Sequence, residues 1–252
     1  MDGRKSFSHN RFEGFTGYLV PPEYNCRLSV RHSDLVDPWV DPDVHLHTQS
    51  DEFYLLLSGR LSLGINGTEL RLQPWEMLCV RAGMPHAILG GDGSIEHFGF
   101  RAPSPDDRLS LGVPSLNKTV TRIEDGKEID EPWGFRASLI DPRNRNCWLI
   151  GLGEARFKSE NFLFAYLNFP NHESANTGIG TRLRMHSHRQ SWEYYLCLRG
   201  FKVLLIDDQE VTVSPGQMVE VHPGARHNII RREAPYEGIT FRVPIRDDKE
   251  EH

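Results

Sequence analysis

The stretch HLHTQSDEFYLLLSG, residues 45–59, decides the fold that we predict for this chain. Side chains alternate between the two faces of a strand, so His45 and His47 point to the same side. The residues that follow favour a turn, and Glu52 then begins a second strand that can return beside the first. Two imidazoles and a carboxylate on one face are three ligands for a divalent metal. Taken alone, each histidine is equally well explained as a surface or core residue.

The same pattern returns 141 residues later, in the stretch HSHRQSWEYYLCLRG at residues 186–200. Its two histidines, its glutamate and its final glycine have the spacing of the first stretch. At the same offset and without a gap, His86 aligns with His227, and residues 100–107 align with residues 241–248. Chance does not produce this agreement, so we interpret the chain as a tandem duplication of one domain.

Each half of the chain therefore has four potential metal ligands. The alternative is a set of core histidines held by hydrogen bonds, but random drift would not keep all four polar residues in both halves while their neighbours changed. The predicted ligands are His45, His47, Glu52 and His86 in the first half, and His186, His188, Glu193 and His227 in the second.

Composition and charge exclude several classes of protein. The 252 residues are 38% hydrophobic and 25% charged, as in an ordinary globular protein. The net charge of −6 argues against a nucleic-acid-binding surface and against adhesion to an anionic membrane. No apolar run is long enough for a membrane span or a signal peptide. The four cysteines lie far apart and indicate neither disulfides nor a thiolate zinc site, so we expect a cytoplasmic protein.

The remaining sequence predicts many short strands. Alternating apolar runs recur between turn signals, and Asn66-Gly67 is typical of a hairpin turn. The 16 prolines and 22 glycines are scattered and disfavour long helices. We therefore predict an all-β fold.

These residues resemble the cupin superfamily, and specifically its two-domain members, the bicupins. Cupin motif 1 has the form G-x5-H-x-H-x3-4-E-x6-G, and the second half matches it in full with Gly180, His186, His188, Glu193 and Gly200. The glycines and histidine of motif 2 are also found in the second half.

The first half departs from the two motifs more often, with Trp39 and Trp75 in place of glycines. We therefore expect the chemistry in the second half, with a weaker or structural metal site in the first.

The resemblance implies two tandem antiparallel β-barrels of the jelly-roll, or double-stranded β-helix, type. We expect an N-terminal cupin barrel at 1–108, a linker at 109–132 and a C-terminal cupin barrel at 133–252. Each barrel would hold up to one divalent metal through three histidines and a glutamate. Fe(II) is favoured, and Mn, Ni, Zn or Cu also suit these ligands. In octahedral geometry two positions stay open for substrate or O₂.

Strand parity adds substrate-binding candidates in the second half. If the strand that carries the second histidine pair extends backwards, Arg182 and Arg184 share its inward face, and Arg231 shares the face of His227. Guanidinium groups there would suit a carboxylate or phosphate. The alternative is that these arginines are solvated at the barrel mouth.

Tyr195 shares the inward parity of Glu193 and is the candidate catalytic residue, although a buried tyrosine often has only a packing role. The first functional hypothesis is an iron-dependent dioxygenase acting on a small anionic organic substrate. The second is a metal-dependent isomerase, lyase or aminohydrolase, in which Tyr195 moves protons. The third is a non-catalytic cupin that binds a small molecule. The expected partner is a small molecule, with no nucleic acid and no membrane, and the resemblance allows a homodimer.

Overall fold

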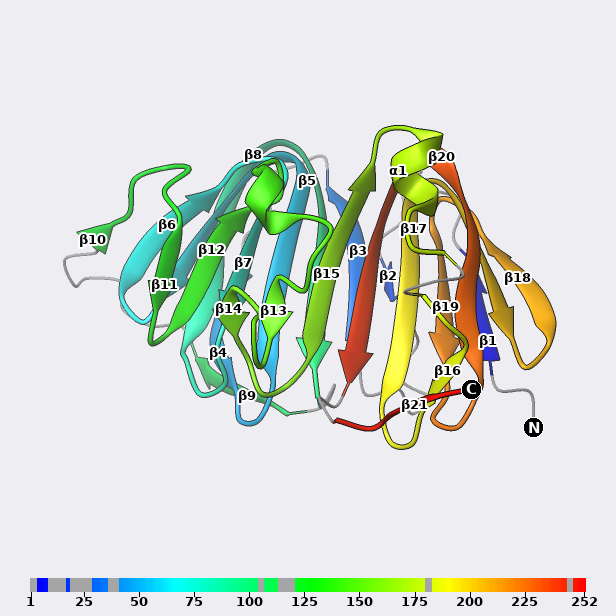
Figure 1. Cartoon of the computed structure of the whole chain (residues 1–252). Helices are drawn as coiled ribbons and strands as arrows, with labels where there is room; N and C mark the ends of the chain where they lie inside the picture. Colours follow the sequence, from blue (N-terminus) through cyan, green and yellow to red (C-terminus); the bar gives the residue numbers. More distant parts are fainter. Residues whose placement is uncertain are drawn as a thin grey trace. The chain divides into compact units, whose positions relative to one another are not determined.

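The computed structural model describes residues 4–8, 17–18, 29–35, 41–103, 107–112, 121–179, 183–243 and 247–252. The chain divides into two compact units. The first unit is Phe12–Pro142, and the second unit is Met1–Arg11 together with Arg143–His252. Regular structure in the described residues is almost entirely β (Figure 1), which confirms the predicted all-β class. None of the helices in these residues has the length and apolar character needed to cross a membrane.

The first unit is one sheet of eleven strands, in which β4, β5 and β8 carry the predicted metal ligands and β5 to β8 carry most of the described core. Its strands are β2 (Gly17–Tyr18), β3 (Ser29–Leu35), β4 (Asp41–His47), β5 (Asp51–Ile65), β6 (Thr68–Leu72), β7 (Glu76–Val80), β8 (His86–Ala102), β9 (Arg108–Gly112), β10 (Thr121–Arg122), β11 (Ile129–Glu131) and β12 (Gly134–Ser138). The order along the sheet is β11-β12-β7-β5-β8-β3-β2, with β4 paired to β8 and β6 to β5.

The second unit repeats this arrangement with ten strands. They are β1 (Arg4–Ser8), β13 (Ile150–Gly151), β14 (Phe157–Lys158), β15 (Leu163–Phe169), β16 (His186–His188), β17 (Trp192–Ile206), β18 (Gln209–Val213), β19 (Gln217–Val221), β20 (His227–Val243) and β21 (Lys249–Glu251), with a helix α1 (His172–Asn176) and a 3₁₀ turn at Pro142–Asn144. The order is β1-β19-β17-β20-β15-β13-β14, with β16 paired to β20 and β18 to β17.

Two long antiparallel strands organise each unit. In the first unit β5 and β8 pair along their lengths, so that Glu52 lies opposite Arg101. In the second unit β17 and β20 pair in the same register, and Glu193 lies opposite Arg242. The two ladders are related by the offset of the sequence repeat, which is what a duplicated domain requires.

A β-bulge interrupts the ladder between β17 and β20. Leu204 pairs with Ile229 and Val203 pairs with Arg231, so Ile230 is an extra residue that pairs with no residue of β17. An extra residue reverses the in-and-out alternation of the strand beyond it. This shift decides which arginine of β20 faces the interior of the second unit.

The strands found in and just after the segment expected to be a linker belong to the first unit. β10 and β11 lie inside the 109–132 segment expected to be a linker, and β12 pairs with β7. The compact units consequently divide the chain after Pro142, beyond the expected boundary at 132–133. The N-terminal strand β1 pairs with β19 and so belongs to the second unit.

The interiors of the two units differ in polarity. Among the buried core residues of the first unit are Leu61 and Ile95. The residues at the aligned positions of the second unit are Lys202 and Tyr236, which are both buried.

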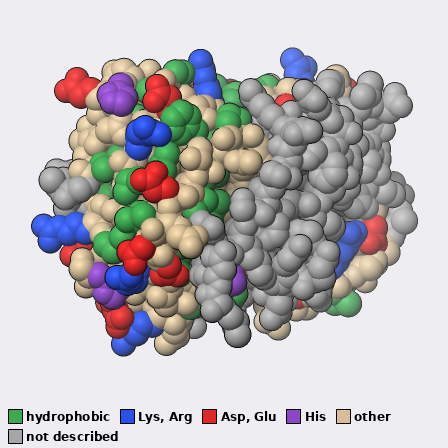
Figure 2. All heavy atoms as spheres, turned by 90° about the vertical axis from the view of Figure 1, so that its right-hand side faces the viewer, with side chains coloured by type: hydrophobic (Ala, Val, Ile, Leu, Met, Phe, Trp, Pro, Cys, Tyr) green, Lys and Arg blue, Asp and Glu red, His purple; other side chains and the backbone are tan. Residues whose placement is uncertain are grey.

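On the face of the molecule drawn in Figure 2, charges of both signs are interspersed over the described residues.

Candidate metal centre

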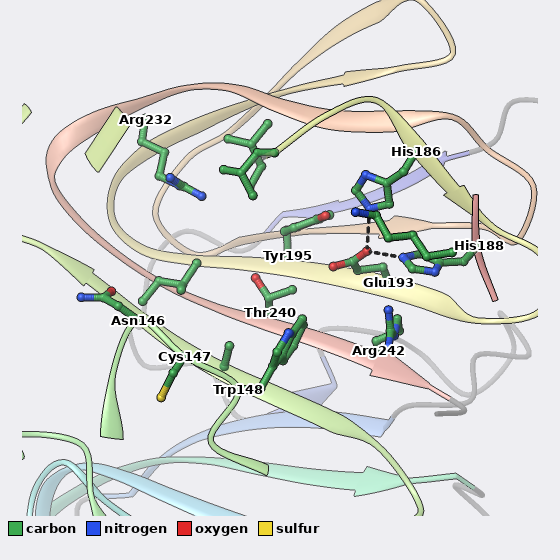
Figure 3. A pocket seen from close by; sticks show the side chains of 15 residues that line it. Asn146, Cys147, Trp148, His186, His188, Glu193, Tyr195, Arg232, Thr240 and Arg242 are labelled. Atoms are coloured by element: carbon green, nitrogen blue, oxygen red, sulfur yellow. Dashed lines mark ion pairs between the residues drawn. The ribbon is translucent and has the colours of Figure 1, made fainter. Parts of the chain in front are cut away.

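The four predicted ligands of the second unit come together at one end of its strands. His186 and His188 lie on β16, Glu193 lies near the start of β17, and His227 begins β20. The Nε2 atoms of the three histidines lie 3.9, 3.2 and 3.1 Å from the same carboxylate oxygen, Oε2 of Glu193. Figure 3 shows this convergence for His186, His188 and Glu193. The donor atoms all lie within 4.8 Å of one another.

The first unit contains the same cluster. The Nε2 atoms of His45, His47 and His86 lie 3.7, 3.1 and 2.7 Å from Oε2 of Glu52. The structure therefore brings all eight predicted ligands into two sets of four. In the first unit the hydroxyl of Tyr54 also donates to this carboxylate oxygen, at 3.0 Å.

Hydrogen bonds at the outer nitrogens fix the tautomer of these histidines. Nδ1 of His186 lies 2.8 Å from the carbonyl oxygen of Arg184, and Nδ1 of His227 lies 3.0 Å from that of Ala225. A carbonyl oxygen can only accept, so Nδ1 carries the proton and the neutral ring leaves a lone pair on Nε2. That lone pair faces Glu193. His45 and His86 are held in the same way, by the carbonyls of residues 43 and 84.

Both clusters fit a divalent metal. With neutral imidazoles, no proton lies between the Nε2 lone pairs and the glutamate oxygen, and these groups would repel one another without a cation. Donor atoms about 2.1 Å from a metal and at right angles to each other lie about 3 Å apart, which is close to most of the separations found here. Three imidazoles and a carboxylate suit Fe, Mn, Ni, Cu or Zn.

The carboxylates of the two clusters are ionised. Burial acts to raise the pKa of Glu193, but the three imidazoles around its carboxylate outweigh burial and hold this pKa well below its usual range. The pKa of Glu52 is lowered by the same balance. Burial also acts to lower the pKa of His45, yet the nearby carboxylate of Glu52 outweighs burial and raises this pKa. Each cluster is therefore a negatively charged site for a cation.

An aspartate supports one histidine of each cluster, and sequence reasoning missed it. Nδ1 of His188 lies 3.1 Å from Oδ1 of Asp248. The other oxygen, Oδ2, accepts the backbone N–H groups of Gln190 and Ser191, both at 2.8 Å. Burial works against ionisation of Asp248, but these N–H groups keep its pKa below the usual value. One carboxylate thus orients a ligand and holds the turn between β16 and β17.

Asp107 does the same for His47 in the first unit, with Nδ1 at 3.1 Å and the N–H groups of Gln49 and Ser50 at 2.8 and 2.7 Å. The signal that could have revealed both aspartates is the alignment of residues 100–107 with residues 241–248. That alignment established the repeat, but a position 60 residues from the histidine carried no sign of contact.

A cavity of about 400 Å³ in the second unit is lined by three of its metal ligands (Figure 3). Apolar side chains from β15, β20 and the segment before β16 form much of its wall. Besides the metal ligands, the polar residues in the wall are Tyr195 on β17, Arg232, Thr240 and Arg242 on β20, Lys249 on β21, and Asn146. Pockets that bind small molecules have this combination of apolar walls and few polar groups.

The arginines predicted to face this cavity do not line it. Arg184 is exposed, and its Nη1 lies 3.9 Å from Oε2 of Glu251. Strand β16 begins only at residue 186, and the described residues 184–185 do not extend it backwards, so Arg184 is not placed inward. Arg231 is exposed on β20 and packs over the ring of Phe201, 5.4 Å from its centroid. Arg182 lies outside the described residues. The bulge in β20 places Arg232 in the cavity wall instead, and Arg242 joins it.

Tyr195 lies in the cavity wall, as its parity predicted. It is buried, and its ring centroid is 6.3 Å from that of His227. Burial, together with the charge of Glu193, raises the pKa of its hydroxyl well above the usual value. Tyr195 therefore keeps its proton at neutral pH and can donate a hydrogen bond. Its catalytic role stays a prediction.

Comparison with known proteins supports the predicted family. Residues 176–235 match the family model described as "Cupin domain". This range contains all four ligands of the second unit. A search of curated protein sequences finds no significant match.

Solved structures share the fold of the whole chain. The protein Ylba from E. coli, of the family model DUF861, is 12% identical, with a TM-score of 0.62 and coverage of 98% of this chain and 93% of that chain. A salicylate 1,2-dioxygenase from Pseudaminobacter salicylatoxidans is 10% identical, with a TM-score of 0.64 and coverage of 92% and 77%. The Lactobacillus farciminis oxalate decarboxylase is 14% identical, with a TM-score of 0.59 and coverage of 100% and 88%. Residues 176–235 of the second unit thus match a cupin domain, and the whole chain shares the jelly-roll fold of these solved structures.

Proposed function

We propose that this cupin-fold protein is a metal-dependent enzyme, an iron-dependent dioxygenase that acts on a small anionic organic compound in the second unit. The observation that carries the proposal is the cavity of about 400 Å³, whose wall includes His186, His188 and Glu193 as well as two arginines. A ligand in this cavity lies against the metal-binding groups and against positive charge at the same time.

Arg242 binds an anionic group of the substrate close to the metal ligands. It lies opposite Glu193 in the pairing of β17 with β20, so the two residues are direct neighbours across the strands. Its guanidinium carbon lies 5.9 Å from the ring centroid of Trp148, which restricts the side chain, and its Nε has no hydrogen-bond acceptor among the described residues. A substrate carboxylate supplies that acceptor.

The rest of the wall excludes water and orients the substrate. Leu167, Leu183 and Ile229 present apolar surface to it. Tyr195 keeps its hydroxyl protonated beside the ligand cluster, where it donates a hydrogen bond to an oxygen of the substrate. Bound Fe(II) would supply a Lewis acid with open positions at which O₂ chemistry is accessible.

A second candidate function is a metal-dependent isomerase, lyase or aminohydrolase, and the environment of Tyr195 favours it. A buried hydroxyl next to a carboxylate is placed to move a proton on the substrate. The same metal would then act only as a Lewis acid.

Metal analysis and O₂ uptake separate the two functions. We expect protein purified without chelator to contain metal, and Fe(II)-loaded protein to consume O₂ with one or more members of a panel of small carboxylates. The Glu193→Gln variant should lose O₂ uptake, whereas Glu52→Gln should keep most of it. Turnover of a substrate with Zn or Mn and without O₂ would instead support the second function. Absence of metal from both units would contradict both.

A further inference from the structure

Arg232 is a buried cation in the wall of the cavity. Its side chain is 4% exposed, and it lines the same cavity as the metal ligands. Nη1 donates to the carbonyl oxygen of Ala175 at 2.7 Å, and the guanidinium packs over the ring of Phe169 at 5.0 Å. These contacts hold the side chain in one orientation, with its end directed into the cavity (Figure 3).

This guanidinium lacks a counter-ion. It forms no ion pair with the described carboxylates, and its buried Nε has no hydrogen-bond acceptor there. Buried charges in proteins are ordinarily paired, because an unpaired charge loses its hydration without compensation. No described residue supplies the missing anion here.

A second buried basic side chain, that of Lys202, lies next to Arg232. Lys202 is opposite Arg232 in the β17–β20 pairing and is fully buried. Its Nζ lies over the rings of Tyr195 and Tyr236, 4.4 and 5.3 Å from their centroids, and has no hydrogen-bond partner among the described residues. Burial and the charge of Arg232 hold the pKa of Lys202 well below its usual value. A lysine can lose its proton in this way, whereas an arginine cannot.

The first unit shows that the fold itself does not need these two basic side chains. At the aligned positions it has Gly91 and Leu61, which pair with each other in the β5–β8 ladder as Arg232 and Lys202 do in the second unit. Both units keep complete ligand clusters, but only the second has a buried arginine at this place. The positive charge of Arg232 is therefore explained by the ligand of the second cavity and not by the fold.

Arg232 lies away from the metal ligands. In Figure 3 it stands at the end of the cavity opposite His186 and His188, with Tyr195 and Thr240 between them. Along β20 it is separated from His227 by the bulge and by no more than about 17 Å of extended strand. One small molecule can span this interval between the cluster and the guanidinium.

We propose that Arg232 binds an anionic group at the far end of the substrate, so that the substrate is a bifunctional organic acid with an apolar body, one end at the metal ligands and a carboxylate at Arg232. This inference rests on the proposed function for the reacting end. The far-end subsite is a property of the protein alone and is testable without turnover.

The test is binding of glutarate, butyrate and butyramide to the full chain, loaded with Zn(II) so that no oxidation occurs, by isothermal titration calorimetry. We expect glutarate to bind more tightly than butyrate, since it engages both ends, and butyramide to bind weakest. In Arg232→Met the affinity for glutarate should fall about tenfold or more and approach that of butyrate in the wild type. Arg232→Lys, which keeps the charge but loses the planar fork, should lie between them.

Arg231→Met is the matched control, because Arg231 is the adjacent residue on β20, carries the same charge and is exposed outside the cavity. It should bind glutarate as the wild type does. Circular dichroism and zinc content show which variants are folded. If Arg232→Met does not fold, the comparison is made with Arg232→Lys. Equal affinity for glutarate in the wild type and in the folded Arg232 variants would overturn the proposal. The wild-type protein could also consume no O₂ with Fe(II) while Arg232→Met still loses glutarate binding. That combination would support the far-end subsite and contradict only the proposed dioxygenase function.

Discussion

Single hydrogen bonds at the outer nitrogen of each histidine prepare the two clusters for metal. Each Nδ1 is held by a backbone carbonyl or by an aspartate, so every Nε2 lone pair is directed inward before any metal binds. The ligands therefore need little rearrangement on binding. The aspartates are the most informative of these contacts, because each can be changed without touching a ligand.

Asp248→Asn should weaken metal binding in the second unit about 10- to 100-fold, since His188 loses the charged acceptor that orients it. The measurement is a competition titration with a fluorescent chelator. Asp247→Asn, one residue away and exposed, is the control and should leave the affinity unchanged. Equal affinities for the two variants would mean that Asp248 only holds the turn.

The same aspartates make the stability of the metal-free protein, prepared with a chelator, depend on pH. The pKa values of Asp107 and Asp248 are lower in the folded protein than the ordinary value of about 4. Groups with a depressed folded pKa stabilise the protein at higher pH and lose this contribution as the pH falls through the folded value. Urea unfolding should therefore show stability dropping below about pH 4. The double variant Asp107→Asn, Asp248→Asn should show a shallower drop, and an unchanged pH profile would refute this account.

At the level of elements, one buried arginine adds to the backbone pairing that holds β12 in the first unit. The Arg136 side chain is 1% exposed and donates to the backbone carbonyls of Arg71, Glu124 and Lys127. Arg136→Met would leave these carbonyls without a donor and should lower the free energy of unfolding by about 2 to 4 kcal/mol. Urea denaturation measures the change.

The control for this prediction is Arg81→Met, which removes a partly exposed ion pair with Asp130 in the same unit. Exposed pairs contribute about 0 to 1 kcal/mol, so the loss should be small. Comparable losses for the two variants would show that the carbonyl contacts of Arg136 do not stabilise β12.

Strand β20 shows how far sequence alone could predict the site. The repeat identified all eight ligands, because identical spacing in two copies is visible in the sequence. The residues that line the cavity were harder to predict from the sequence. Parity counting assumed an uninterrupted strand through Arg231, and the extra residue Ile230 moves Arg232 inward instead. A bulge is set by pairing with another strand, and nothing in the local sequence marks it.

At the level of the whole molecule, duplication has produced two ligand clusters with different surroundings. Fully loaded protein should contain two metal ions per chain, measured by elemental analysis of dialysed protein. Glu193→Gln should reduce the content to about one and abolish activity. Glu52→Gln should also reduce it to about one but keep most of the activity, since the cavity belongs to the second unit. Loss of both metals from either variant would show that the sites are coupled.

The pairing of β1 with β19 has a consequence for how the protein is made. Arg4 lies opposite Val221, so β1 leaves the ribosome more than 200 residues before its partner strand β19. The first unit contains all of its own strands within Phe12–Pro142 and can form while synthesis continues. Contacts this distant in sequence form slowly. The second unit, which contains the cavity, is therefore completed last, after both copies of the repeat have been translated.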